Sequence, residues 1–492
     1  MQLQEQPKKN QQQQQLKPST VSFSAFFAIY LFGLVICIPT SLLICCRVMR
    51  VIIIHPEQWN GGSDRCTIGF LRHFVQAGHQ VAWLTTMIDD YWADEEFKGV
   101  EIHEVRLPLH PGDWFSQNIA LAYHIIFRTK LKPDLIVADH SASCVPLLKW
   151  WFPKVHIMFY CHFPQQLVTP NRFFLYRWYS ACMGLIEAHM CEYADMVIVN
   201  SEFTSKNFQA VMPSIPKEKL RVIYPPCDVD SLSVVSRPIS RKHRMHNERY
   251  LFLSMNRFWP EKRLDIILDA AVQLKSFGLN PLIQMAGSVM PHIPESKIYY
   301  ELLKEQCKKY NLEDIIEFIP DPNDEKKFEL YSQCDSVIYT PPNEHFGIVP
   351  IEALEQRRPV IVIDSGGPSE TVIEGVTGTK ISDTDGIKLA EAMVEHMESK
   401  EWINLDDDAH YVMQRARFEK HFSLNGFGQN IDKAVTKIFG KDMNANNDEE
   451  QQIMEAHTNG FTSYTSHAKR QKKPEGNLKG KARQNGQDRK NA

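Results

Sequence analysis

Residues 336–363 read SVIYTPPNEHFGIVPIEALEQRRPVIVI. The two ends of this stretch, Ser336–Tyr339 and Val360–Ile363, are short runs rich in β-branched residues, which is typical of strands buried on both faces. Pro350 fits the first turn of a helix, because the amide that proline lacks would have no partner there. The stretch therefore predicts a strand, a crossover helix and a second, parallel strand.

The same alternation of apolar runs and helical stretches extends outward from this unit. Further strands of the same series are expected at Leu251–Ser254, Leu282–Ala286 and Ile315–Ile319. A separate series begins nearer the N-terminus and includes a helix over about 62–77. Its strands are expected at Val51–Ile54, Val81–Leu84, Asp134–Ala138, Val155–Tyr160, Met196–Asn200 and Val222–Tyr224. Because strands that alternate with helices form parallel sheets, the sequence predicts an α/β fold with two Rossmann-like domains.

Composition divides the chain into segments around these two series. The expected segments are a disordered Gln-rich start (1–17), a membrane anchor (18–46), an N-terminal Rossmann-like domain (47–225), a linker (226–249), a C-terminal Rossmann-like domain (250–420), a closing helix (421–440) and a disordered basic tail (441–492).

Charge and cysteine content exclude several classes of protein. A formal net charge of −4 over 492 residues argues against a nucleic-acid-binding body, because phosphate backbones are usually met by a basic face. The 11 cysteines contain no C-x-x-C pair, which indicates neither a zinc site nor a disulfide framework. The chain also lacks N-x-S/T sequons. Both features favour a body on the cytosolic side of a membrane.

The segment 18–46 carries no charged residue, and Val21–Cys46 is long enough to cross about 30 Å of hydrocarbon. A cleaved signal peptide is the alternative, but the apolar run is long and no small-residue cleavage site follows it. Lysines precede the segment and arginines follow it in similar number, so the orientation of the anchor stays open. Pro39 leaves a re-entrant hairpin as a further alternative.

Three short motifs follow predicted strands, where the turns of parallel α/β sheets bind ligands. The first contains Gly61 and Gly62 at the start of a helix, where a backbone without side chains can approach a ligand closely. The motif has neither the dinucleotide-binding nor the P-loop glycine pattern. An ordinary tight turn is the alternative. The second motif contains Arg257 and Lys262, which would clamp a diphosphate or, alternatively, remain surface cations in solvent.

The third motif is the loop of the opening stretch, from Asn343 to Glu352. Glu344 lies before the helix and Glu352 about one turn inside it, so both carboxylates would face one ligand. Glu344 is expected to contact a sugar and Glu352 a ribose hydroxyl. The amides at the helix start, in Gly347, Ile348 and Val349, are expected to face phosphate oxygens. Glutamates at helix starts are also common partners of the helix dipole, which is the alternative for either one alone.

Together these motifs resemble the retaining GT-B glycosyltransferases of family four. The resemblance runs from about residue 50 to 437 and lies in two glutamates separated by seven residues, the upstream Arg-x-x-x-x-Lys and the Gly-Gly turn. Tyr160–Pro164, Asn343–Pro350 and Ser365–Pro368 are similar to the dolichol-pathway mannosyltransferases of that family. Tyr160–Pro164 and Ile348–Pro350 favour the transferases that form α-1,3 and α-1,6 linkages over those that form α-1,2 linkages. Asp64 departs from the pattern, because a glutamate is commoner there.

The resemblance implies a role for each motif in a cleft between the two domains. Arg257 and Lys262 would hold the donor diphosphate, Glu344 the transferred sugar and Glu352 the nucleotide ribose, while Gly61 and Gly62 would border the active site. His162, after a predicted strand, matches a position where family members contact the sugar. A satisfied core histidine is the alternative at that position.

The implied reaction transfers mannose with retention from GDP-mannose to dolichol-diphosphate-linked Man-GlcNAc-GlcNAc at the cytosolic face of the endoplasmic reticulum. No metal is expected, since no D-x-D motif lies near the site. The expected partners are the lipid-linked acceptor, the membrane and other dolichol-pathway mannosyltransferases. Another lipid-linked transfer, α-1,2-mannosyl or UDP-sugar-dependent, and a non-catalytic membrane scaffold remain alternatives.

Overall fold

The computed structural model describes residues 48–440, apart from 60, 93–96, 169–173, 228–248, 291–292, 399–401, 403–404 and 406–407. The expected Gln-rich start, membrane anchor and basic tail, with most of the linker, lie outside the described residues. Among the helices that are described, none has both the length and the hydropathy needed to cross a bilayer.

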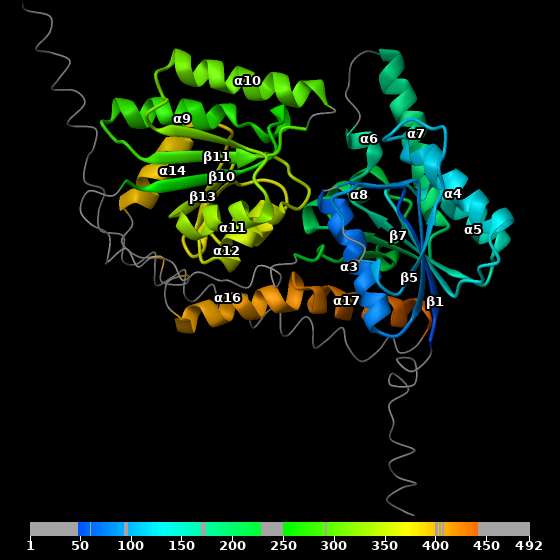
Figure 1. Ribbon diagram of the computed structural model, residues 1–492. Coiled ribbons are helices and arrows are strands. Elements are labelled where there is room, and N and C mark those ends of the chain that lie inside the picture. Colours follow the sequence, from blue (N-terminus) through cyan, green and yellow to red (C-terminus); the bar gives the residue numbers. More distant parts are fainter. Residues whose placement is uncertain are drawn as a thin grey trace, which may run out of the picture. The chain divides into compact units, whose positions relative to one another are not determined.

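Two parallel sheets confirm the predicted α/β framework (Figure 1). The first has the order β5-β3-β1-β6-β7-β8-β9 and the second the order β12-β11-β10-β13-β14-β15. The strands of the first sheet are β1 (Arg50–Ile54), β3 (Gln80–Thr85), β5 (Val100–Glu104), β6 (Leu135–Asp139), β7 (His156–Cys161), β8 (Met196–Val199) and β9 (Leu220–Val222). Those of the second are β10 (Leu251–Met255), β11 (Leu282–Gly287), β12 (Ile316–Pro320), β13 (Ser336–Tyr339), β14 (Val360–Ile363) and β15 (Gly378–Ile381).

Helices cover both faces of each sheet. Those that follow strands of the first sheet are α3 (Gly62–Gln76), α4 (Trp114–Arg128), the short 3-10 turn η2 (Ala142–Cys144), α5 (Val145–Trp151), α6 (Gln165–Val168), α7 (Phe174–Glu192), α8 (Glu202–Val211) and the turn η3 (Lys217–Lys219). Those of the second are the turn η6 (Pro260–Lys262), α9 (Asp265–Ser276), α10 (Pro294–Lys309), α11 (Asp324–Gln333), α12 (Ile348–Glu355), α13 (Pro368–Thr371) and α14 (Gly386–Glu398). Two more helices, α16 (Asp408–His421) and α17 (Leu424–Ile438), follow them.

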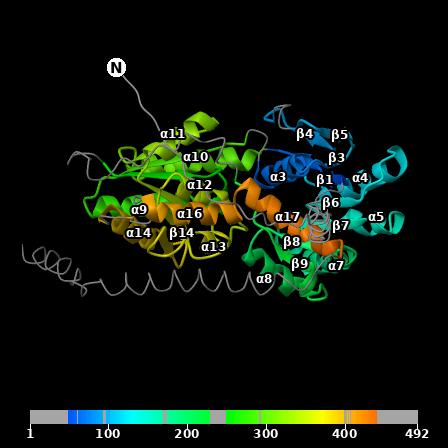
Figure 2. The ribbon, with the colours of Figure 1, turned by 90° about the horizontal axis from the view of Figure 1, so that it is seen from below.

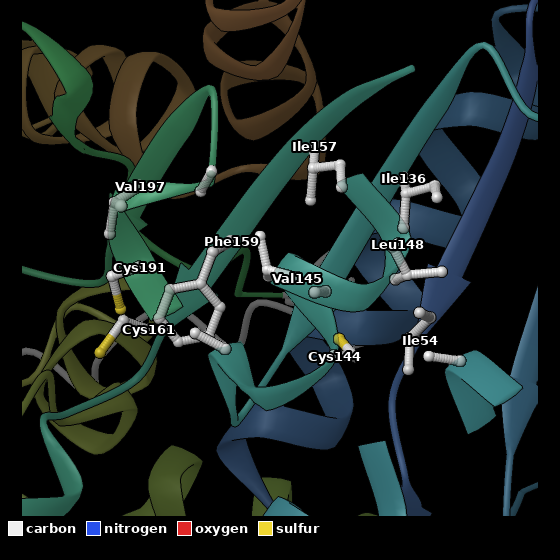
Figure 3. Packing of buried hydrophobic residues seen from close by; sticks show 14 of the residues in the cluster. Ile54, Ile136, Cys144, Val145, Leu148, Ile157, Phe159, Cys161, Cys191 and Val197 are labelled. Carbon is white, nitrogen blue, oxygen red and sulfur yellow. The ribbon is translucent and has the colours of Figure 1, made fainter. Parts of the chain in front are cut away.

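Each central strand supplies two hydrophobic cores, because successive side chains point to opposite faces of a sheet. In β1, Ile52 and Ile54 pack in one core while Val51 and Ile53 pack in the other. Figure 3 shows Ile54, Ile136 and Ile157 of the first of these cores beside Val145 and Leu148 of α5. This two-sided burial is the physical reason why the central strands appear in the sequence as uninterrupted apolar runs.

Helix α17 follows the second sheet in the chain but packs against the first. Its residues Phe427 and Ile431 belong to the core that contains α3 and one face of β1. The rings of Phe427 and Phe70 meet edge to face with centroids 4.9 Å apart. Figure 2 shows α17 beside α3 from below. The predicted closing helix therefore completes the core of the first sheet.

The structure departs from the sequence prediction mainly at the edges of the sheets. The strand expected at Val222–Tyr224 lies two residues earlier, at β9. The edge strands β5 and β15 had not been predicted. Strand β5 is largely exposed and its sequence VEIHE lacks an apolar run, and β15 has only four residues, GTKI, of which two are polar. Two short strands, β2 (Glu57–Gln58) and β4 (Met87–Ile88), pair beside the first sheet and had also not been predicted.

Candidate functional site

The second sheet reverses its strand order between β10 and β13, and such a reversal opens a crevice at the carboxyl ends of the strands. The turn after β10 carries Lys262, and the loop after β13 carries Glu344. The Lys262 ammonium and a Glu344 carboxylate oxygen form a close ion pair. Thr340 donates a hydrogen bond of 2.6 Å to the carbonyl of Lys262, which joins the two loops. Two residues 82 positions apart are thus held together at this point.

Charge around Glu344 keeps its side chain ionised. Burial alone would raise the pKa of the Glu344 carboxyl, but the positive charges of Lys262 and, more weakly, Arg257 lower it. Arg257 is exposed, and its side chain makes no hydrogen bond or ion pair within the described part of the chain. A paired ammonium and an exposed guanidinium therefore both act on Glu344, which suits an anionic ligand.

Two glycines allow the loop of Glu344 to pack closely against the turn after β14. Gly366 has a φ of +71°, and a Cβ there would lie 2.3 Å from the Glu344 carbonyl oxygen. A Cβ on Gly367 would lie 2.3 Å from the Phe346 carbonyl oxygen. The Gly367 amide donates to the Glu344 carbonyl at 2.8 Å. The Ser365–Pro368 motif is therefore a support for the loop that carries Glu344.

Gly347 is the N-cap residue of α12, with a φ of +80°. No side chain caps this helix, so the first amides, those of Ile348 and Val349, keep the free donors of a helix start. Pro350 lies in the first turn as predicted. These amides directly follow the loop that carries Glu344. Their contacts with phosphate oxygens stay a prediction.

Glu352 lies one turn inside α12 and is buried. One of its carboxylate oxygens accepts a hydrogen bond of 2.6 Å from Lys327, and the other accepts one of 3.0 Å from the Tyr331 hydroxyl. Both Glu344 and Glu352 lie close enough to Tyr339 to add to the effect of burial in raising the pKa of its hydroxyl. The two glutamates therefore flank one side chain. The predicted contact between Glu352 and a ribose stays a prediction.

The first sheet reverses its strand order between β1 and β6. His55 follows β1 and Asp139 ends β6, and both side chains are buried. His55 Nδ1 lies 2.7 Å from an Asp139 oxygen, and His55 Nε2 lies 3.1 Å from an Asp64 oxygen. Since both carboxylates accept hydrogen bonds, both ring nitrogens must carry a proton. Burial lowers the pKa of His55, but these two hydrogen bonds outweigh it and raise the pKa to about 9.

Two further histidines surround Asp139. His162 Nε2 lies 2.9 Å from the second Asp139 oxygen, although the N–H does not point along the line to it. The His140 ring stacks on Trp114 at 4.2 Å between centroids. Burial lowers the pKa of His140 to about 3, so that ring is neutral. Asp139 stays charged, because its imidazole neighbours outweigh burial and lower its pKa well below the ordinary value.

His55, Asp139 and His140 also come close enough to be compared with a metal site, with one ligand atom from each within 4.8 Å of the others. A histidine must offer an unprotonated nitrogen to a metal. Both His55 nitrogens already face carboxylates, so the ring has no lone pair to offer. The donor set therefore fits a charged hydrogen-bond network rather than a metal centre.

The Gly-Gly turn is tied to this network through Asp64. Gly61 is the N-cap residue of α3, and its amide donates to Asp64 at 2.7 Å. The Trp59 amide donates to the other Asp64 oxygen at 3.0 Å. Gly62 has open space where a Cβ would be. Asp64, the departure from the family pattern, thus closes a capping box that also holds His55.

The loops of the two sheets meet beside His162 and Glu344. The ring of Phe163, the neighbour of His162, stacks on the ring of His345, the neighbour of Glu344, at 3.8 Å. The Ser201 hydroxyl donates to the His345 carbonyl at 2.5 Å. His162 and Glu344 are the chain neighbours of the two stacked rings, Phe163 and His345. The structure therefore brings the site residue predicted in the first domain close to the one predicted in the second.

Sequence reasoning found the charged residues of the second sheet but missed His55, Asp139 and His140. A signal was present, since His55 directly follows one apolar strand and Asp139-His140 ends another. Only the strand order makes those two strands neighbours.

Comparison with known proteins agrees with this geometry. Residues 60–231 match the model of Glycosyltransferase Family 4, and residues 235–417 match that of Glycosyl transferases group 1. The chain is 28% identical to mouse Alpha-1,3/1,6-mannosyltransferase ALG2 over 412 residues, which is 79% of this chain and 96% of the relative. The human protein of that name is 29% identical over 413 residues, with the same coverage. The Saccharomyces cerevisiae protein is 27% identical over 444 residues, 80% of this chain and 85% of the relative.

Solved structures share the fold. A glycosyltransferase from Rickettsia africae superposes with a TM-score of 0.62 at 17% identity, over 80% of this chain and 100% of the other. Anabaena Alr3699/HepE, in complex with UDP and glucose, gives a TM-score of 0.61 at 18% identity, over 79% and 99%. At these identities the likeness shows the fold alone. Since the two family models cover both sheets and the curated relatives align over most of their length, the chain belongs to the GT-B glycosyltransferases of family four.

Proposed function

We propose that the chain is a retaining α-mannosyltransferase that transfers mannose from GDP-mannose to dolichol-diphosphate-linked Man-GlcNAc-GlcNAc, forming α-1,3 and α-1,6 linkages. The observation that carries the proposal is the Lys262–Glu344 ion pair at the strand-order reversal of the second sheet. The similarity to α-1,3/1,6-mannosyltransferases over 79% of the chain supports the choice of sugar and linkage.

The proposed mechanism neutralises the leaving diphosphate with fixed positive groups. As the sugar–phosphate bond breaks, negative charge grows on the diphosphate, and Lys262, Arg257 and the first amides of α12 would stabilise it. Glu344 orients the Lys262 ammonium by the ion pair between them. We propose that the acceptor hydroxyl attacks from the face that the diphosphate leaves, which retains the configuration without a carboxylate nucleophile.

The proposed setting is the endoplasmic reticulum membrane, with residues 18–46 as the anchor and the catalytic body on the cytosolic face. The eight cysteines in the described part of the chain are all free, which suits a reducing compartment. Protease treatment of sealed microsomes tests the orientation. A cytosolic body would be digested, whereas a luminal body would survive until detergent is added.

Product analysis tests the reaction itself. The full chain in detergent is incubated with a synthetic lipid-linked Man-GlcNAc-GlcNAc acceptor and with labelled GDP-mannose or UDP-GlcNAc, each with and without EDTA. We expect mannosylated product from GDP-mannose only, with linkages identified by specific mannosidases, and no loss of rate with EDTA. Transfer from UDP-GlcNAc alone, or an α-1,2 product, would reject the proposed donor or linkage.

The variant Lys262→Met separates an enzyme from a non-catalytic scaffold. Loss of one group that stabilises the transition-state charge is expected to lower kcat by about 10²–10³-fold. The control is Lys275→Met, which removes a surface lysine paired with Asp314 and should leave kcat unchanged. Wild-type turnover in Lys262→Met would move the site elsewhere.

A further inference from the structure

A chain of side-chain contacts begins at the Gly-Gly turn and ends at His162, which follows β7. It links Asp64, His55, Asp139 and His162 through contacts of 3.1, 2.7 and 2.9 Å. Asp64 is fixed by two backbone amides of the Gly-Gly turn. His55 and Asp139 are fixed by the ends of two adjacent strands. The first three members are buried, and only His162 has a side chain that is partly exposed.

We propose that Asp139 is a positioning residue that sets the orientation and the tautomer of His162, and that the Asp64–His55 pair holds Asp139 in place for this task. The proposal rests on the proposed function, because it takes His162 to contact the reacting sugar, which is the role that the family resemblance implies for this residue. Asp139 itself touches no substrate. It acts through the ring of His162.

The chemistry follows from the acceptors available. An ionised carboxylate only accepts hydrogen bonds, so the His162 nitrogen that faces it, Nε2, must carry the proton. In the neutral ring Nδ1 is then an acceptor, ready to receive a hydrogen bond from a sugar or acceptor hydroxyl. The charged His55 ring supports this arrangement. Its charge keeps Asp139 ionised, and its Nδ1–H donates to the carboxylate oxygen that His162 does not face.

The surroundings of Asp139 restrict it to this arrangement. The His140 amide donates to Asp139 at 2.7 Å, on the oxygen that faces His162. Asn118 donates from its side chain to the Asp139 carbonyl at 2.8 Å. His140 has a φ of +62°, which is uncommon for a residue with a side chain. The carboxylate is therefore held by backbone and side chains alike. The N–H of His162 is misaligned with this carboxylate, and we propose that the hydrogen bond between them tightens when a ligand binds.

The first test is a double-mutant cycle on kcat with GDP-mannose and the lipid-linked acceptor. Asp139→Asn keeps the shape of the side chain but removes its charge. Because the His140 amide donates to the oxygen that faces His162, the variant keeps an amide oxygen on that side, which is a weaker acceptor for the Nε2 proton than a carboxylate. We expect kcat to fall by about 10–100-fold. The KM for GDP-mannose should change little, because the protein groups proposed to bind the diphosphate lie in the second domain. In the His162→Ala background the same substitution should lower kcat by less than about threefold, because Asp139 acts through the His162 ring.

Asp195→Asn is the matched control. Asp195 pairs with Lys149 at 2.7 Å and lies 3.8 Å from His156 Nδ1, at the opposite end of the strand that leads to His162. This variant removes a carboxylate beside a histidine of the same strand, so it is expected to lower the melting temperature without changing kcat. A fall in kcat as large as that of Asp139→Asn would show that the effect comes from general loosening of the sheet.

A second readout is independent of turnover. Protein labelled with ¹⁵N-histidine is expected to show His162 with a protonated Nε2 and an unprotonated Nδ1. In Asp139→Asn we expect a smaller excess of this tautomer, with the signal assigned by its loss in His162→Ala. If Asp139→Asn does not fold, His55→Gln replaces it. That variant keeps a donor toward Asp139 without the charge, and its smaller loss of kcat should likewise vanish in the His162→Ala background.

Several outcomes would overturn the proposal while the proposed function stands. These are equal costs of Asp139→Asn in both backgrounds, an unchanged His162 tautomer, or a His162→Ala variant with wild-type kcat. If the wild-type protein transfers no mannose from GDP-mannose while the tautomer responds to Asp139 as expected, the proposed function fails and the positioning stands.

Discussion

His55 is a buried side chain that carries a positive charge because a carboxylate faces each of its ring nitrogens. Its pKa of about 9 lies above the ordinary value of about 6.5 for histidine. A raised pKa means that the charged ring stabilises the fold fully below pH of about 6.5, and that this contribution is lost as the pH rises through about 9. The lowered pKa values of Asp64 and Asp139 have the opposite effect on stability. The two ionised carboxylates stabilise the fold near neutral pH, and this contribution is lost only as the pH falls through their lowered pKa values.

The first prediction is that thermal stability falls between pH 6.5 and 9.5 because His55 loses its proton. The shift from about 6.5 to about 9 corresponds to a contribution on the order of a few kcal/mol. Melting curves at both pH values measure the fall, which should be clearly smaller in His55→Gln. The exposed His189 provides the control, since His189→Gln should melt as the wild type does at both pH values. An equal fall in His55→Gln would assign the effect to other groups.

At the scale of elements, the loop that carries Glu344 depends on a glycine in the turn after β14. Gly366 and Gly375 have nearly the same backbone conformation, with φ of +71° and +70°. They differ in their surroundings, because a Cβ on Gly366 would strike the Glu344 backbone whereas a Cβ on Gly375 would meet open space. The pair therefore separates the cost of the backbone conformation from the cost of displacing the loop that carries Glu344.

Gly366→Ala is predicted to impair both stability and catalysis, and Gly375→Ala only stability. An alanine in this conformation costs about 1–2 kcal/mol at either position. At Gly366 the loop must also shift, which moves Glu344 away from Lys262 and lowers kcat by at least about tenfold. Chemical denaturation and kcat measurements on both variants provide the comparison. Similar kcat values in the two variants would contradict the supporting role of this turn.

For the whole molecule, the C-terminal helices join the two domains. Helix α17 completes the core of the first sheet although it follows the second in the chain. Glu370 of α13 accepts hydrogen bonds from the Glu202 and Phe203 amides, at 3.0 and 2.6 Å, so a residue of the second domain caps helix α8 of the first. These contacts attach the second domain to the first.

Phe427→Ala is predicted to destabilise the first sheet selectively. Phe427 is fully buried, and removal of a buried phenylalanine ring typically costs about 3–5 kcal/mol. Hydrogen exchange should quicken in β1 and α3, while β10 and β13 keep most of their protection. Gln429→Ala, an exposed change on the same helix, should leave exchange unchanged. Faster exchange confined to the second sheet would show that α17 does not stabilise the first.

The sequence by itself determined the two parallel sheets and the charged motif of the second. Ser336–Tyr339 and Val360–Ile363 form strands with the predicted bounds, because burial on both faces leaves an uninterrupted apolar run. Lys262 and Glu344 were found because each follows such a run. Edge strands such as β5 are largely exposed and lack that signal.

Only the tertiary structure decided that His55, Asp64, Asp139 and His162 form one network. No spacing along the chain indicates it, since the strands that carry His55 and Asp139 are 80 residues apart in sequence and become neighbours through the strand order. A periodic pattern reports how one element buries its own faces. Which strand ends meet depends on how the strands are ordered across the sheet, and that order is fixed by the packing of the whole domain.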